Sequence, residues 1–199
     1  MLGGQHLATD FKFRKDAVKS LTNSIGVYVL CDLDGVPLYV GQSKDGIRNR
    51  VARHLTSARS DIIANRQIDV WEVAYVWTYP VVSNEQITHL EALLYHHFNP
   101  NSQLINGVVP PAPESPYTIP EPEQKVQVMS DSEIASRREE VHRLPRQANH
   151  YAAIVGHFLE VKQSKQIGRA MAAHFQRLNR YHERLLGIAS SAENDQKDD

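Results

Sequence analysis

The chain has 199 residues, of which 41% are hydrophobic and 23% charged, so it can bury a core and is unlike a disordered polymer. A formal net charge of -1 excludes a global polycation, and a nucleic-acid partner would have to bind a local basic patch. The single cysteine, Cys31, excludes an internal disulfide and a cysteine-rich metal site, and it favours a cytoplasmic location. No apolar run approaches the roughly 18 residues of a membrane span, and the first residues lack the apolar stretch of a signal peptide.

The N-terminal half of the chain predicts two strands joined by a tight turn, then a helix, a strand and a second helix. The turn is indicated by Asp34-Gly35 between two β-branched and aromatic runs. Ile47, Val51 and Leu55 recur every fourth residue, which is typical of an amphipathic helix. The expected elements are strands at 25–31 and 36–40, a helix at 45–59, a central strand at 70–79 and a helix at 83–98.

Six prolines within residues 110–122 predict an extended linker, because neither helix interiors nor central strands tolerate that density. Ser130 and Glu133 have the spacing of a capping box, and helical periodicity follows, with Pro145 as the expected break between helices. The chain therefore divides into a domain at 1–108, a linker at 109–129, a helical region at 130–189 and a disordered tail at 190–199.

Apolar stripes on the predicted C-terminal helices need a partner surface. One runs through Tyr151, Ile154 and Phe158, and another follows from Ile167 to Leu178. Since about sixty helical residues make only a thin core, we expect this region to dock on the N-terminal domain or to form a homodimer with its own copy. The sequence leaves both alternatives open.

Two short motifs lie ten residues apart on the first two predicted strands: GVY at 26–28 and YVG at 39–41. Alone they are typical of strand packing. Together with Arg50 on the following basic helix and Glu91 on the later helix, they resemble the GIY-YIG nuclease superfamily over residues 24–107. The resemblance implies an α+β fold with a three-stranded antiparallel sheet flanked by helices, to which this chain adds a C-terminal α-helical extension.

The resemblance also implies site residues. Tyr28, Tyr39 and Arg50 match catalytic positions, and Glu91 matches the glutamate that binds a divalent metal, Mg²⁺ or Mn²⁺. His54 lies one helical turn after Arg50, where some restriction enzymes of the family carry a histidine.

One position departs from the family pattern. The usual catalytic asparagine falls at Gln103, so either Gln103 substitutes for it or a short insertion brings Asn106 into that role. We favour Asn106.

Basic side chains cluster beside the second motif. Lys44, Arg48 and Arg53 join Arg50 in a segment whose acidic residue is Asp45, and they are the predicted DNA-binding residues. Arginines are also in excess in the C-terminal helices, where they could bind DNA phosphates or form a solvated charged surface.

Phosphodiester hydrolysis needs several groups at once, because one preorganised donor supplies only about 3 to 4 kcal/mol of the roughly 8 to 23 kcal/mol required. Tyr28 is a candidate proton acceptor, although a phenol with a pKa near 10 is rarely ionised at neutral pH.

From the resemblance and the basic segment we expect a metal-dependent DNA endonuclease, acting in restriction, a mobile element or repair. The alternative is a non-catalytic nucleic-acid-binding protein on the same scaffold, in which Glu91 would pair with a structural base or turn away.

Overall fold

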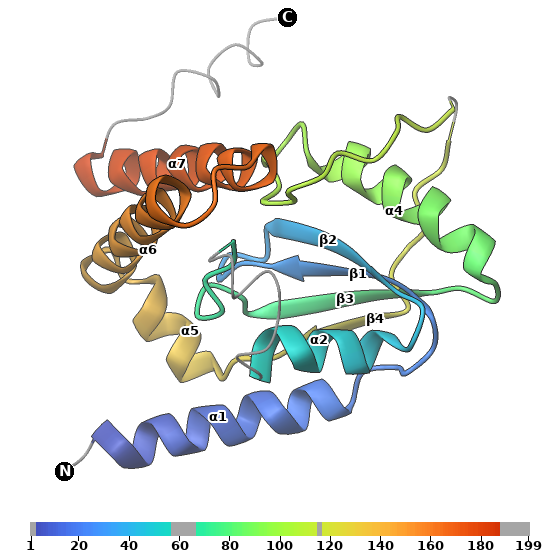
Figure 1. The fold of residues 1–199 in the computed structure, drawn as a ribbon. Helices are drawn as coiled ribbons and strands as arrows, with labels where there is room; N and C mark the ends of the chain where they lie inside the picture. Colours follow the sequence, from blue (N-terminus) through green and yellow to red (C-terminus); the bar gives the residue numbers. More distant parts are fainter. Residues whose placement is uncertain (1–2, 57–66, 115–116, 188–199) are drawn as a thin grey trace, which may run out of the picture.

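The computed structural model describes residues 3–56, 67–114 and 117–187, and it has an α+β architecture (Figure 1). Four strands form one antiparallel sheet in the order β2-β1-β3-β4. The strands are β1 (Gly26–Cys31), β2 (Pro37–Ser43), β3 (Tyr75–Pro80) and β4 (Gln124–Gln127). The predicted three-stranded sheet therefore gains a fourth strand, which makes β3 an interior strand.

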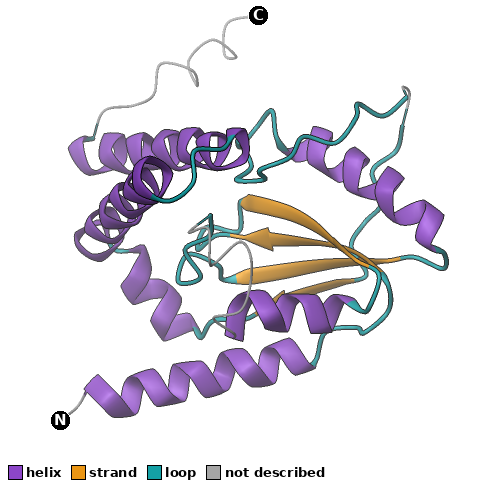
Figure 2. Ribbon diagram, viewed as in Figure 1, coloured by secondary structure: helices purple, strands orange, loops and turns teal. Residues whose placement is uncertain are grey.

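Helices lie on both sides of the sheet and at one of its ends (Figure 2). In the described ranges they are α1 (Gly3–Lys19), α2 (Ile47–Thr56), α4 (Asn84–Phe98), α5 (Asp131–Arg138), α6 (Glu140–Glu160) and α7 (Lys165–Leu186). None of them combines the length and apolar character that a helix needs to cross a membrane.

β1 is buried on both faces, so its six residues alternate between two cores. Val27 and Val29 pack on the side of α4, together with Ile87 of that helix. Tyr28 and Leu30 pack on the opposite side, where α1 and α2 cover the sheet. This alternation places Tyr28 next to α2, the helix that carries the predicted catalytic arginine.

Several predicted elements differ from the observed ones. β4 comes from the predicted linker, since residues 124–127 lie beyond the proline cluster and can donate hydrogen bonds to β3. The strand predicted at 70–79 begins only at Tyr75, because turns occupy the preceding residues. Pro145 lies inside α6, and the break between α5 and α6 falls at Glu139, whose ψ of 132° is not helical. The predicted tail at 190–199 is outside the described residues.

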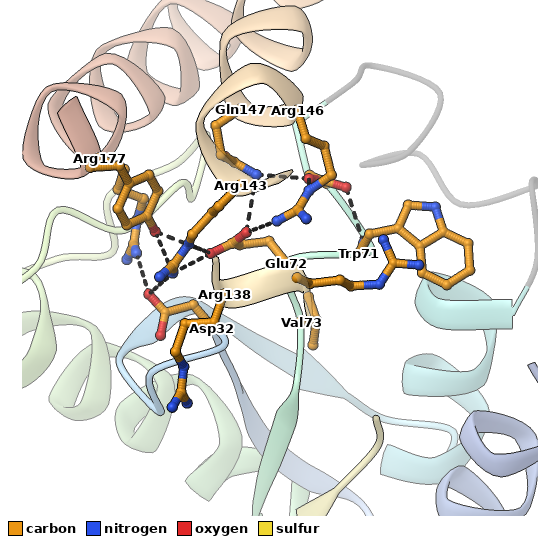
Figure 3. A network of polar contacts seen from close by, with 12 residues as sticks. Asp32, Trp71, Glu72, Val73, Arg138, Arg143, Arg146, Gln147 and Arg177 are labelled. Carbon is orange, nitrogen blue, oxygen red and sulfur yellow. Dashed lines mark hydrogen bonds and ion pairs between the residues drawn. The ribbon is translucent and has the colours of Figure 1, made fainter. Parts of the chain in front are cut away.

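The C-terminal helices dock on the sheet domain through a buried polar network (Figure 3). Arg143 donates to Glu72 and to Asp34, and its side chain is only 3% exposed. Arg177 donates to Asp32 at 2.9 Å, and both side chains are 2% exposed. Much of the arginine excess that suggested DNA contacts in this region is thus committed to internal ion pairs.

The apolar stripes of α6 and α7 are used mainly inside the protein. Ile154 and Ile167 are buried, and α6 and α7 lie against each other. Phe175 stacks near Tyr151 with 5.6 Å between ring centroids but is 56% exposed. Docking on the N-terminal domain therefore accounts for much of this region, and pairing of two chains through it stays a prediction.

Candidate active site

The two motif tyrosines are brought together by strand register. Tyr28 of β1 lies opposite Gly41 of β2, and the Tyr28 and Tyr39 ring centroids are 6.2 Å apart. A Cβ atom on Gly41 would collide with the hydroxyl and ring of Tyr28. The glycine of the second motif is therefore required because the first-motif tyrosine passes directly over it.

The glycine of the first motif has a different role. Gly26 has a φ of 153°, and a Cβ there would collide with the backbone oxygen of Tyr79 on β3. The absence of a side chain lets β3 pair closely with β1 at this end of the sheet. The two motif glycines therefore meet different needs. Gly26 allows the backbone of β3 to come close, and Gly41 allows the side chain of Tyr28 to come close.

α2 contributes a histidine and an arginine to the tyrosine pair. The Tyr28 hydroxyl oxygen is 2.7 Å from Nε2 of His54, and both side chains are buried. Arg50 lies close enough to Tyr28 to lower its pKa through charge and a hydrogen bond, although burial outweighs both. The Nε atom of Arg50 is buried and has no hydrogen-bond partner among the described residues.

Burial controls the protonation of this cluster. It raises the pKa of Tyr28 well above its usual value and that of Tyr39 to about 12. Burial also lowers the pKa of His54 to about 3, and the charges of Arg50 and Arg53 lower it further. At neutral pH both phenols are therefore protonated and the imidazole is neutral, so its unprotonated nitrogen can accept a hydrogen bond.

Glu91 projects from α4 toward the sheet edge formed by β2. Nε2 of Gln42 donates to its Oε2 at 2.8 Å, and no Lys, Arg or His in the described ranges lies within ion-pair distance of it. Burial raises the pKa of Glu91, while the Gln42 hydrogen bond opposes that rise. Oε1 of Gln42 is buried and has no partner in the described part of the chain. In the described ranges, therefore, neither the carboxylate nor this amide oxygen has a cationic partner.

The side chain of Asn106 hydrogen-bonds to the backbone of β2 beside Tyr39. Its Oδ1 accepts from the Val40 amide at 3.0 Å, and its Nδ2 donates to the Val40 carbonyl at 2.6 Å. Val40 lies between the tyrosine and the glycine of the second motif, so this double hydrogen bond holds Tyr39 in place. Asn106 is thus tied to the backbone of the second motif, while Gln103 is partly exposed.

The three predicted DNA-binding residues are in different environments. Lys44 is exposed. Arg53 forms an ion pair with Asp45 at 2.9 Å, and both side chains are well exposed. Nε of Arg48 donates to the Leu21 carbonyl at 2.7 Å and so ties α2 to the segment that follows α1. Arg48 has a structural contact that spacing alone does not indicate.

A cleft of about 380 Å³ lies beside Tyr39 and Glu91. Its other walls come from segments that the sequence analysis did not connect with the site, and they include Gln67, residues 107–111 and Gln166 of α7. Nothing in the local sequence signals these contributions, because tertiary contacts bring together residues that are distant in the chain. Within the described residues, no group of three or more His, Cys, Asp or Glu side chains is arranged to hold a metal ion.

The N-terminal region thus combines two cross-strand tyrosines, an arginine of α2 and a glutamate beside a cleft. Residues 24–106 match the family model described as the GIY-YIG catalytic domain. This N-terminal region therefore belongs to the GIY-YIG family, whose domains are generally nucleases. No curated protein and no solved structure matches the chain significantly.

Proposed function

We propose that the protein is a metal-dependent endonuclease that hydrolyses phosphodiester bonds of DNA. One observation carries this proposal. The side chains of Tyr28, Tyr39, His54 and Arg50 lie together in one cluster, and Glu91 faces that cluster. Both tyrosines experience the charges of Arg50 and Glu91, which supports a single site. Restriction, a mobile element or repair is the proposed context, and the cytoplasm is the proposed location.

The donor set beside the cleft fits one divalent cation, Mg²⁺ or Mn²⁺. The carboxylate of Glu91 and the unpartnered Oε1 of Gln42 are the oxygen ligands that such ions prefer. When bound, the ion would supply charge neutralisation and stabilisation of the leaving oxygen. A neutral amide partner keeps Glu91 available for this role, whereas a structural cation would neutralise it.

Arg50 is the proposed group that holds a nonbridging phosphate oxygen. Its guanidinium is a planar cation suited to phosphate oxygens, and its unpartnered Nε is a donor already desolvated by the fold. A preorganised donor of this kind costs no reorganisation as charge develops on the phosphate.

The two tyrosines and His54 are the proposed proton-handling groups. Tyr39 lines the cleft, Tyr28 lies behind it, and Tyr28 contacts both Tyr39 and Nε2 of His54. In a concerted relay, Tyr39 would accept a proton from the attacking water while passing its own hydroxyl proton to Tyr28, and Tyr28 would pass its proton to Nε2 of His54. A phosphate bound at Arg50 would offset the positive charge that lowers the pKa of His54, and so make the imidazole a better acceptor.

The alternative is a non-catalytic nucleic-acid-binding protein. It predicts that Glu91 is paired with a structural base or turned away from the tyrosines. The Gln42 contact and the adjacent cleft favour the catalytic interpretation.

The decisive experiment is Glu91→Gln in the full chain. We expect this variant to lose more than about 100-fold in plasmid cleavage with Mg²⁺ or Mn²⁺, because one carboxylate holds the ion. DNA binding should persist, since removing an anion near phosphates does not weaken the attraction. Glu85→Gln, an exposed position in the first turn of the same helix, is the control and should cleave normally. Unchanged cleavage by Glu91→Gln would refute the mechanism.

A further inference from the structure

The cleft beside Glu91 has a composition unlike that of a phosphate-binding site. No Lys or Arg is among the described residues that line it, and its charged side chain is Glu91 itself. A phosphate deep in this cleft would be repelled by that carboxylate and would find no cation other than a bound metal ion. Away from Glu91, whose metal ion would hold the scissile phosphate, the remaining part of the cleft therefore fits a neutral occupant.

One wall of the cleft is apolar and anchored. It consists of residues 108–111, which are two valines followed by two prolines. Nε2 of His96 on α4 donates to the Pro110 carbonyl at 2.9 Å and so fixes this segment against the helix that carries Glu91. Val108 is 61% exposed. A large apolar side chain held open to solvent in this way offers a surface for a flat ring.

Two neutral amide side chains, Gln67 and Gln166, also line the cleft. Nε2 of His174 donates to the backbone oxygen of Gln67 at 2.8 Å, which holds that residue in place. Gly107 lets the amides approach, since a Cβ there would lie 2.9 Å from Cβ of Gln166 and 3.3 Å from Nε2 of Gln67. Amide side chains both donate and accept, as the edge of a nucleobase requires.

From these walls we infer that the cleft binds an unpaired nucleobase next to the scissile phosphate. This inference rests on the proposed function and adds the substrate class, which is DNA with a displaced or unpaired nucleotide at the cut. A paired base is held in the stack and cannot enter a cleft of this kind without the cost of being flipped out. The C-terminal helix α7 thereby takes part in substrate recognition through Gln166.

The test measures DNA binding by the full chain carrying Glu91→Gln, so that cleavage does not interfere. The probes are one duplex in three forms: fully paired, with a single unpaired 2-aminopurine, and with an abasic site at that position. We expect the unpaired base to bind about tenfold tighter than the paired duplex, with a change in its fluorescence, as for one stacked base. The abasic probe should lose this preference.

Two further substitutions identify the occupant. Gln166→Ala should reduce the preference for the unpaired base, while Gln163→Ala, an exposed glutamine just before α7, should not. Val108→Lys should also reduce the preference, because it replaces the apolar wall with a cation. A gain in affinity for all three probes with Val108→Lys would show that the cleft takes the phosphate backbone, which overturns the inference.

Three other results would also contradict it. An abasic probe that binds as tightly as the 2-aminopurine probe would mean that the protein recognises only flexible DNA. Equal binding of the paired and unpaired probes would exclude base capture. Failure to bind any of the DNAs would contradict the proposed function itself, and the inference with it.

Discussion

Two buried polar clusters in this protein differ in how their charges are compensated. In the docking network, Arg143 and Arg177 each meet carboxylates of the sheet domain (Figure 3). In the tyrosine cluster, Arg50 has no carboxylate within ion-pair distance among the described residues. Uncompensated buried charge is costly, so it persists where a ligand can supply the missing partner. The comparison separates an internally compensated network from a cluster whose missing partner, under the proposed function, is the substrate phosphate.

The largest expected effect on stability comes from Arg143→Met, which leaves buried carboxylates without their principal cation. We expect a loss of about 3 kcal/mol in the free energy of unfolding, measured by urea denaturation of the full chain. Arg184→Met is the control, because Arg184 contacts the same Asp34 at 3.3 Å but is 49% exposed. It should cost less than about 1 kcal/mol. Equal, small losses for both variants would mean that the docking network does not hold the helices.

Arg50→Ala should lower the cleavage rate without lowering the stability of the fold. Its cleavage rate should fall about 100- to 1000-fold, because the group that faces the developing charge is lost, while stability stays the same or rises. Arg53→Ala, on the exposed side of α2, should mainly weaken DNA binding and reduce its salt dependence. If both losses are equal and are recovered at low salt, Arg50 is only an electrostatic contact.

Gln42→Leu is expected to give the smallest effect, in the pH profile. The amide hydrogen bond favours the charged form of Glu91, so its removal raises the pKa of that carboxyl further. Since metal binding needs the carboxylate, the acid limb of the cleavage profile should move to higher pH. A Mn²⁺ titration of the variant should show weaker binding.

The matched control for Gln42→Leu is Gln103→Leu, at the position where the family pattern expects its asparagine. Asn106 already holds the Val40 backbone, so this substitution should leave the pH profile and Mn²⁺ binding unchanged. A shift of similar size in both variants would assign the effect to general changes in the domain rather than to the contact with Glu91.

Periodicity and turn signals in the sequence were enough to predict the hairpin and helices α2 and α4, while α1 was not predicted, and the motif residues carried the resemblance to the family. Alternation along β1 and fourfold spacing along α2 are local properties, so they predict which faces are buried. The same patterns placed Tyr28, Tyr39, Arg50, His54 and Glu91 on elements that the fold then brings together. Glycines at 26 and 41 carried a further signal, because the close approaches they permit tolerate no side chain.

Tertiary structure alone decided what depends on partners distant in the chain. β4 forms because residues 124–127 pair with the free edge of β3, and no local sequence pattern predicts that pairing. From the sequence, the C-terminal arginines could form a basic surface. In the structure they form ion pairs with Asp32, Asp34 and Glu72, which lie more than seventy residues away in the sequence. Gln67 and Gln166 likewise line the cleft through tertiary contacts between residues that are distant in the sequence. Pairing of buried charges and the walls of a cleft are set by three-dimensional proximity, which sequence spacing does not measure.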